Sequence, residues 1–248
     1  MSQPRRHIDW YYDFISPFAY FGFLRLRELG DVDIRYHAVL LAELLKRHGH
    51  KGPAEIPAKR TWTYRSCVWW AAQHGVPFRF PAAHPFNPLP YLRLAIAAGN
   101  TPQAIGRIFE ALWTTGADPA DPNVLAALAS ALGVDPAQVT SDEVKQQLRH
   151  ETEHAAERGM FGVPTYLVDG QLFWGADATD FRNPGLPAGT IALSHFTCSA
   201  DENPRRQSGL IEAATQHRLT DRGAADVAEA DDGDLKRARE FLGHTRTL

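Results

Sequence analysis

A serine followed by a proline stands where an apolar run gives way to an amphipathic segment. Ser16-Pro17 follows the run from His7 to Ile15 and precedes the segment from Phe18 to Leu29. This pattern predicts a strand followed by a helix, with Ser16 at the N-cap and Pro17 at the first helical position. A helix N-terminus offers unpaired N–H groups and a positive dipole end, which suit an anion such as a thiolate. A serine hydroxyl donating to that thiolate would stabilise it by about 1.5 to 3 kcal/mol, equivalent to about one to two pKa units.

Two simpler roles for Ser16 stay open at this point. It can serve only as a helix cap, or it can act as a nucleophile. The nucleophile role has little support, since the sequence has no Gly-x-Ser-x-Gly elbow and no assignable His–Asp partner. Thioredoxin-like redox enzymes carry Cys-Pro-x-Cys at such a position. Here Ser16 and Ala19 stand in place of both cysteines, which disfavours a dithiol oxidoreductase. The site would have to take a thiol from another molecule.

The second candidate segment is Gly162-Val163-Pro164-Thr165, directly before a predicted hairpin. The turn of that hairpin is Asp169-Gly170, and the apolar stretches Pro164 to Val168 and Gln171 to Trp174 flank it. A loop with a proline at a strand start is ordinary by itself. Only its combination with Ser16-Pro17 makes it informative.

Hydrophobic patterning predicts one α/β domain with an interrupted core. His7 to Phe14 and the alternation around Val32 to Tyr36 predict two strands around the first helix. Helices are expected next at Lys59–His74, Leu89–Ala98, Gln103–Trp113, Val124–Leu132 and Ser141–Arg158. A run of this length is enough for a helical subdomain inserted before the hairpin.

Composition narrows the class of protein. The 248 residues are 44% hydrophobic and carry a net charge of -3, which argues against nucleic acid or an anionic membrane as the main partner. No stretch reaches the roughly 18 apolar residues of a membrane span, and we expect no signal peptide at the start. The two cysteines lie far apart and suggest no disulfide framework, so a cytoplasmic location is expected. The histidines show no metal-ligand spacing, and no metal site is expected.

These segments together resemble the 2-hydroxychromene-2-carboxylate isomerases, which are similar to kappa-class glutathione transferases and to the DsbA-like thioredoxin fold. The resemblance covers about residues 7 to 181 and is carried by Asp13-Phe-Ile-Ser-Pro-Phe-Ala-Tyr20, Asn87-Pro-Leu89, Phe161-Gly-Val-Pro-Thr-Tyr166 and Phe173-Trp-Gly-Ala-Asp177. It implies a discontinuous thioredoxin-like domain at 1–39 and 159–186 and an all-helical insertion at 40–158. The remainder, 187–248, is charged and poor in aromatic residues, and is expected to be a weakly ordered tail.

The resemblance also implies site residues and a cofactor, glutathione. Ser16 matches the family's catalytic serine beside the glutathione sulfur, and Val163, before an expected cis Pro164, matches the residue whose backbone pairs with the cysteinyl group. The segment Trp174-Gly175-Ala176-Asp177 matches a stretch whose aspartate meets the γ-glutamyl ammonium. Lys59 and Asn87 match positions near the substrate carboxylate and hydroxyls, although a solvated lysine and an Asx turn before Pro88 are equally good explanations.

The implied function is a glutathione-dependent isomerase. It converts 2-hydroxychromene-2-carboxylate to trans-o-hydroxybenzylidenepyruvate in the catabolism of naphthalene-type aromatics, with a small aromatic substrate as its partner and a homodimer as its expected assembly. Two alternatives stay open: a kappa-type glutathione transferase or peroxidase, which would consume glutathione, and a non-catalytic glutathione-binding protein of the same fold.

Overall fold

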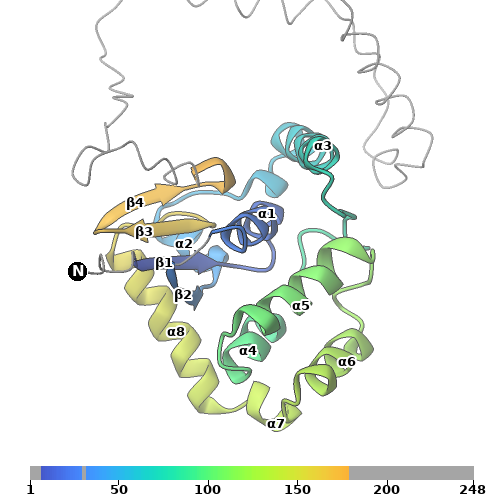
Figure 1. Cartoon of the computed structure of the whole chain (residues 1–248), viewed down its shortest axis with the longest axis vertical. Helices are drawn as coiled ribbons and strands as arrows, with labels where there is room; N and C mark the ends of the chain where they lie inside the picture. Colours follow the sequence, from blue (N-terminus) through green and yellow to red (C-terminus); the bar gives the residue numbers. More distant parts are fainter. Residues whose placement is uncertain (1–6, 30–31, 179–248) are drawn as a thin grey trace, which may run out of the picture. The chain divides into compact units, whose positions relative to one another are not determined.

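A computed structural model describes residues 7–29 and 32–178 of the chain. Its centre is a four-stranded sheet in the order β2-β1-β3-β4, made by β1 (His7–Tyr12), β2 (Asp33–Ala38), β3 (Thr165–Val168) and β4 (Gln171–Trp174). Strands β1 and β2 run parallel, whereas β3 is antiparallel to both of its neighbours, β1 and β4 (Figure 1). The central strand β1 therefore joins the two parts of the chain that the helices separate in sequence.

Helices fill the chain between the paired strands. Helix α1 (Pro17–Leu26) connects β1 to β2. The segment between β2 and β3 holds α2 (Leu41–Arg47), the 3₁₀ helix η1 (Pro53–Glu55), α3 (Pro57–His74), α4 (Leu89–Ala97), α5 (Pro102–Thr114), α6 (Pro122–Leu132), α7 (Pro136–Val139) and α8 (Asp142–Glu157). All five predicted helices of this segment are present. The short helices α2 and α7 were not predicted, and α1 ends three residues before the predicted Leu29.

The two faces of the sheet pack against different helices because side chains alternate along β1. On one face, Ile8, Trp10 and Tyr12 join an aromatic core with residues of α1, α4 and α5. Phe109 of α5 lies at its centre, with its ring 4.7 Å from that of Phe14. The main core therefore lies between the sheet and the inserted helices, so the insertion completes the core on this face.

The opposite face of β1 combines a smaller apolar cluster with charged side chains. Tyr11 packs with residues of α2 and α8 in that cluster. Asp9 Oδ1 lies 3.0 Å from His7 Nε2 and 3.1 Å from His37 Nε2, and His37 Nδ1 lies 2.8 Å from Glu151 of α8. Burial alone would lower the pKa of His37, but the Glu151 and Asp9 carboxylates outweigh burial and raise it. This cluster links both parallel strands to α8.

The predicted hairpin turn is confirmed. Asp169 and Gly170 both take positive φ angles, 50° and 79°, between β3 and β4. Two positive φ angles in a two-residue loop match the twist of paired strands, and an Asp-Gly pair accepts them at low cost. The turn sets the register in which β4 pairs with β3. That register positions the residues that follow Trp174.

The described residues belong to one compact unit, which spans Met1–Pro184. The predicted tail at 187–248 lies outside the described residues, and the boundaries proposed for the thioredoxin-like and helical parts stay predictions. Across the described residues, no helix combines the length and apolar character that a membrane crossing requires.

Candidate functional site

Ser16 occupies the N-cap of α1, as predicted. Its backbone is extended, with φ −95° and ψ 116°, and its Oγ accepts a 3.3 Å hydrogen bond from the Ala19 N–H. Pro17 fills the first helical position, where its missing N–H leaves nothing unpaired. The serine is only 6% exposed. The Ser16 hydroxyl is therefore buried and lies at the positive end of the helix dipole.

The hydroxyl of Ser16 faces the second predicted segment across the fold. Ser16 Oγ donates to the Val163 carbonyl oxygen over 3.5 Å, a long hydrogen bond between residues 147 positions apart. The Val163–Pro164 peptide is cis, as predicted. Gly22 of α1 permits this approach, because a Cβ there would meet the Tyr166 hydroxyl and lie 3.3 Å from Pro164 Cγ. The structure thus brings Ser16 and Val163 together.

The segment from Trp174 to Asp177 lies beside the same cis proline. The Gly175 N–H donates to the Pro164 carbonyl oxygen at 3.0 Å. The Trp174 indole covers Gly162, where a Cβ would lie 2.5 Å from its Nε1. Ala176 is buried, whereas Trp174 and Asp177 are exposed. An exposed indole and an exposed carboxylate therefore flank the short segment that bonds to the cis proline.

The loop before Ser16 is fixed by a buried carboxyl group. Asp13 accepts hydrogen bonds from the N–H groups of Ile15 at 3.0 Å and Leu41 at 2.9 Å. Its backbone carbonyl accepts the Ser16 N–H at 3.2 Å. Burial raises the pKa of Asp13 to about 7, although the two backbone N–H groups favour its ionised form. Asp13 belonged to the quoted motif, but the sequence assigned it no role.

Two further side chains hold this loop, and neither was predicted. Trp113 Nε1 donates to the Phe14 carbonyl at 2.9 Å, and His84 Nε2 lies 2.8 Å from the Ile15 carbonyl oxygen. Both come from the inserted helical segment. A histidine directly before Pro85 in an aromatic stretch is the available sequence signal, and it does not indicate which loop the ring contacts.

The two predicted substrate residues are exposed. Lys59 lies in the first turn of α3, and Asn87 lies just before α4. Asn87 Oδ1 accepts the Leu89 N–H at 3.1 Å, which is the Asx turn considered from the sequence. This bond uses one lone pair and leaves the amide N–H₂ free to donate. Their role in substrate binding stays a prediction.

The described part of the chain has no reactive thiol of its own. Cys67, its single cysteine, is buried in α3, and burial raises its pKa to about 12. A thiol with such a pKa is almost wholly protonated near neutral pH. Among the described residues, no cluster of His, Cys, Asp or Glu side chains could hold a metal ion. Cys67 is therefore a poor source of a nucleophilic sulfur for the Ser16 site.

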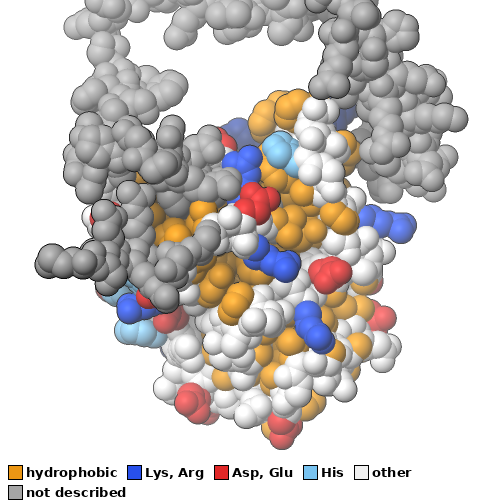
Figure 2. All heavy atoms as spheres, in the orientation of Figure 1, with side chains coloured by type: hydrophobic (Ala, Val, Ile, Leu, Met, Phe, Trp, Pro, Cys, Tyr) orange, Lys and Arg blue, Asp and Glu red, His pale blue; other side chains and the backbone are white. Residues whose placement is uncertain are grey.

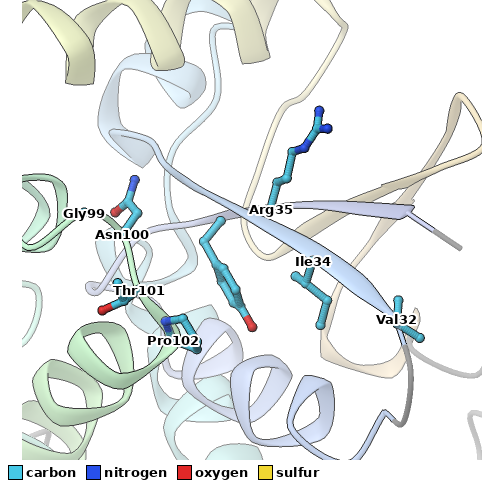
Figure 3. A pocket seen from close by; sticks show the side chains of 8 residues that line it. Val32, Ile34, Arg35, Gly99, Asn100, Thr101 and Pro102 are labelled. Atoms are coloured by element: carbon cyan, nitrogen blue, oxygen red, sulfur yellow. The ribbon is translucent and has the colours of Figure 1, made fainter. Parts of the chain in front are cut away.

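A separate hollow of about 530 Å³ opens at the edge strand β2. Ile34, Arg35 and Tyr36 line one side, and residues 99–102 line the other (Figure 3). None of its lining residues belongs to the Ser16 and Val163 segments. It is an open surface feature, and the chemistry predicted from the sequence does not involve it.

The chain is similar to proteins of known families. The profile of the DSBA-like thioredoxin domain family matches residues 7–183. A 2-hydroxychromene-2-carboxylate isomerase of Sphingobium xenophagum is 33% identical over 186 residues, covering 70% of this chain and 94% of the relative. Glutathione S-transferase kappa 1 of Homo sapiens is 24% identical over 196 residues, covering 69% of this chain and 87% of the relative.

A solved structure has a similar fold. The selenomethionine form of a 2-hydroxychromene-2-carboxylate isomerase superposes with a TM-score of 0.63 at 26% sequence identity, covering 71% of this chain and 91% of that one. With the profile match, this superposition confirms the predicted fold class, an α/β thioredoxin-like domain that carries a helical insertion.

Proposed function

The chain belongs to the 2-hydroxychromene-2-carboxylate isomerase family of DsbA-like thioredoxin proteins, and from this premise we propose that it is a glutathione-dependent isomerase. The proposed reaction converts 2-hydroxychromene-2-carboxylate to trans-o-hydroxybenzylidenepyruvate. The observation that carries the proposal is the buried Ser16 hydroxyl, which lies at the N-terminus of α1 and faces the Val163 carbonyl at 3.5 Å.

The residues around Ser16 fit glutathione. Within the described residues, the Val163 N–H has no backbone partner, and its carbonyl accepts only the long bond from Ser16. Such a backbone edge can pair with the cysteinyl unit of a tripeptide, as an added strand does. The exposed Asp177 carboxylate, two residues after the Gly175 that bonds to Pro164, can receive the γ-glutamyl ammonium. Trp174, Gly175 and Ala176 would complete this wall.

Glutathione, when bound, would supply the thiol that adds to the substrate and leaves it again. The chain's own contribution is to hold that thiol ionised and in place. The Ser16 hydroxyl gives up little when it turns from a 3.5 Å bond towards a thiolate. The α1 N-terminus adds a favourable dipole, and the low exposure of Ser16 strengthens both interactions.

The substrate side of the proposed site lies with the inserted helices. We propose that Lys59 attracts the substrate carboxylate and that the Asn87 amide binds a hydroxyl. Hydrophobic side chains are exposed around α3 in the surface view (Figure 2). Trp62 and Trp69 of that helix are 69% and 58% exposed. An aromatic substrate needs such apolar area, and the exposed tryptophans supply it.

The decisive experiment follows the absorbance of 2-hydroxychromene-2-carboxylate with and without glutathione. We expect no turnover without glutathione and full turnover when glutathione is present in far smaller amount than the substrate. The concentration of free thiol should be unchanged at the end. Equal turnover in thiol-free buffer would refute the proposal.

One alternative has specific support, a kappa-type glutathione transferase or peroxidase. The human kappa 1 transferase matches 69% of this chain. In that case the same assay would show loss of free thiol in proportion to product. We also propose that the protein is a homodimer, and gel filtration with light scattering can check its mass. The location we propose is the cytoplasm.

A further inference from the structure

His84 lies between the loop that carries Ser16 and helix α3. Its Nε2 is 2.8 Å from the Ile15 carbonyl oxygen, and its Nδ1 is 2.7 Å from the Tyr64 hydroxyl. A carbonyl oxygen can only accept a hydrogen bond, so Nε2 must carry the proton in this contact. The partner on the loop therefore selects the tautomer of the ring.

The proton arrangement sets the role of each ring nitrogen of His84. Burial lowers the pKa of His84, which favours the neutral ring with its single proton on Nε2. The Nδ1 atom is then an acceptor. Burial raises the pKa of Tyr64, so its hydroxyl keeps a proton. That proton faces two acceptors, because the hydroxyl also donates to the His84 carbonyl oxygen at 2.9 Å. Tyr64 therefore holds both the ring and the backbone of His84, while Nε2 of that ring holds Ile15.

The contact with Ile15 fixes a single peptide plane from both sides. The Ile15 carbonyl oxygen and the Ser16 N–H belong to the same planar unit. His84 holds the oxygen, while the Ser16 N–H donates to the Asp13 carbonyl at 3.2 Å. Rotation of this plane would change the φ angle of Ser16 and redirect its Oγ away from Val163. Holding the plane therefore holds the hydroxyl.

We propose that His84 and Tyr64 are positioning residues for the thiol site. They orient Ser16 through the Ile15 carbonyl, and they tie the helix that carries Lys59 to the loop that carries Ser16. This inference rests on the proposed function, because it concerns the same serine. It adds two residues from the inserted segment that touch neither thiol nor substrate.

The test compares two amide replacements of His84. The Nε2 of a glutamine can take the place of the imidazole Nε2 and donate to the Ile15 carbonyl. The amide of an asparagine reaches only the Nδ1 position and leaves that carbonyl without its donor. His84→Gln therefore keeps the bond to Ile15 and loses the contact of Nδ1 with Tyr64, whereas His84→Asn keeps a polar atom near Tyr64 and loses the bond to Ile15. The readouts are the ultraviolet thiolate absorbance of bound glutathione against pH, and kcat and KM in the isomerase assay.

We expect His84→Asn to lower kcat about tenfold, as loss of one oriented hydrogen bond would do. Less of the bound glutathione should be ionised at neutral pH, and the KM for glutathione should change little. His84→Gln should retain most of the kcat and most of the ionised glutathione. Tyr64→Phe removes only a hydroxyl and gives a second variant expected to fold, with a smaller loss of kcat.

Each contrary outcome identifies which claim is wrong. If both His84 variants lose activity equally in step with thermal stability, the residue is merely structural and the inference is overturned. If both retain full activity and thiolate absorbance, it is overturned as well. If the parent binds no thiolate at all, the proposed function and this inference fail together.

Discussion

Replacing Ser16 with alanine separates its two structural roles, helix cap and thiolate donor. A cysteine thiol has an ordinary pKa of about 8.5. A charge-assisted hydrogen bond of about 1.5 to 3 kcal/mol lowers that pKa by about one to two units. Because the Ser16 hydroxyl breaks only a 3.5 Å bond to reach the sulfur, little of this energy is lost. We expect the pKa of bound glutathione to be about 7 in the parent and near 8.5 in Ser16→Ala.

The expected kinetic effect follows from the ionised fraction. At pH 7 that fraction falls from about one half to about 3%, so turnover should fall by about tenfold or more. At about pH 9, where most of the thiol is ionised in both proteins, the difference should shrink to less than about twofold. Turnover against pH, together with thiolate absorbance against pH, measures both quantities. Glutathione affinity should change only modestly.

Ser141→Ala is a matched control for the lost helix cap. Ser141 caps α8 with a 3.3 Å bond from the Val144 N–H, the same distance as the Ser16 cap of α1. Each substitution should cost about 1 kcal/mol of stability, measured by urea unfolding. Only Ser16→Ala should change the thiolate titration. An unchanged titration in Ser16→Ala would show that the serine is only a cap and would refute the reasoning.

Two further substitutions test the packing and the charge cluster of the described fold. Gly22→Ala should lower the free energy of unfolding by about 1 to 3 kcal/mol, since its Cβ would meet the Tyr166 hydroxyl. Adding Tyr166→Phe to the same chain should recover part of this loss in denaturant titrations. If Gly22→Ala alone left the stability unchanged, the close approach of α1 to Pro164 would be contradicted. His37 has a raised pKa, so its stabilisation is complete below about pH 6.5 and is lost as pH rises through the folded pKa. His37→Gln should therefore flatten the decline in stability above that pH, and identical slopes for parent and variant in urea unfolding would argue against the Asp9 and Glu151 contacts.

Local sequence determined most of the elements and several of their boundaries. Apolar alternation marked β1 and β2, and Asp169-Gly170 supplied the two positive φ angles that the hairpin requires. Ser16-Pro17 marked the start of α1, because an N-cap and its following proline act within one helical turn. The helices Leu41–Arg47 and Pro136–Val139 were missed because seven and four residues are too few to display a clear helical repeat of apolar side chains. These features depend on neighbours a few residues apart, which a sequence displays directly.

The tertiary structure alone decided which distant groups meet. Ser16 and Val163 lie 147 residues apart, and hydrophobic periodicity does not indicate a contact over that separation. The family resemblance suggested this contact. The close packing of Gly22 on Pro164 permits it. The distant contacts of Asp13 with Leu41 and of His84 with Ile15 could not be predicted from the sequence, because the partners are backbone groups. Any residue offers the same N–H or carbonyl, so only the path of the chain determines that His84 reaches the carbonyl of Ile15.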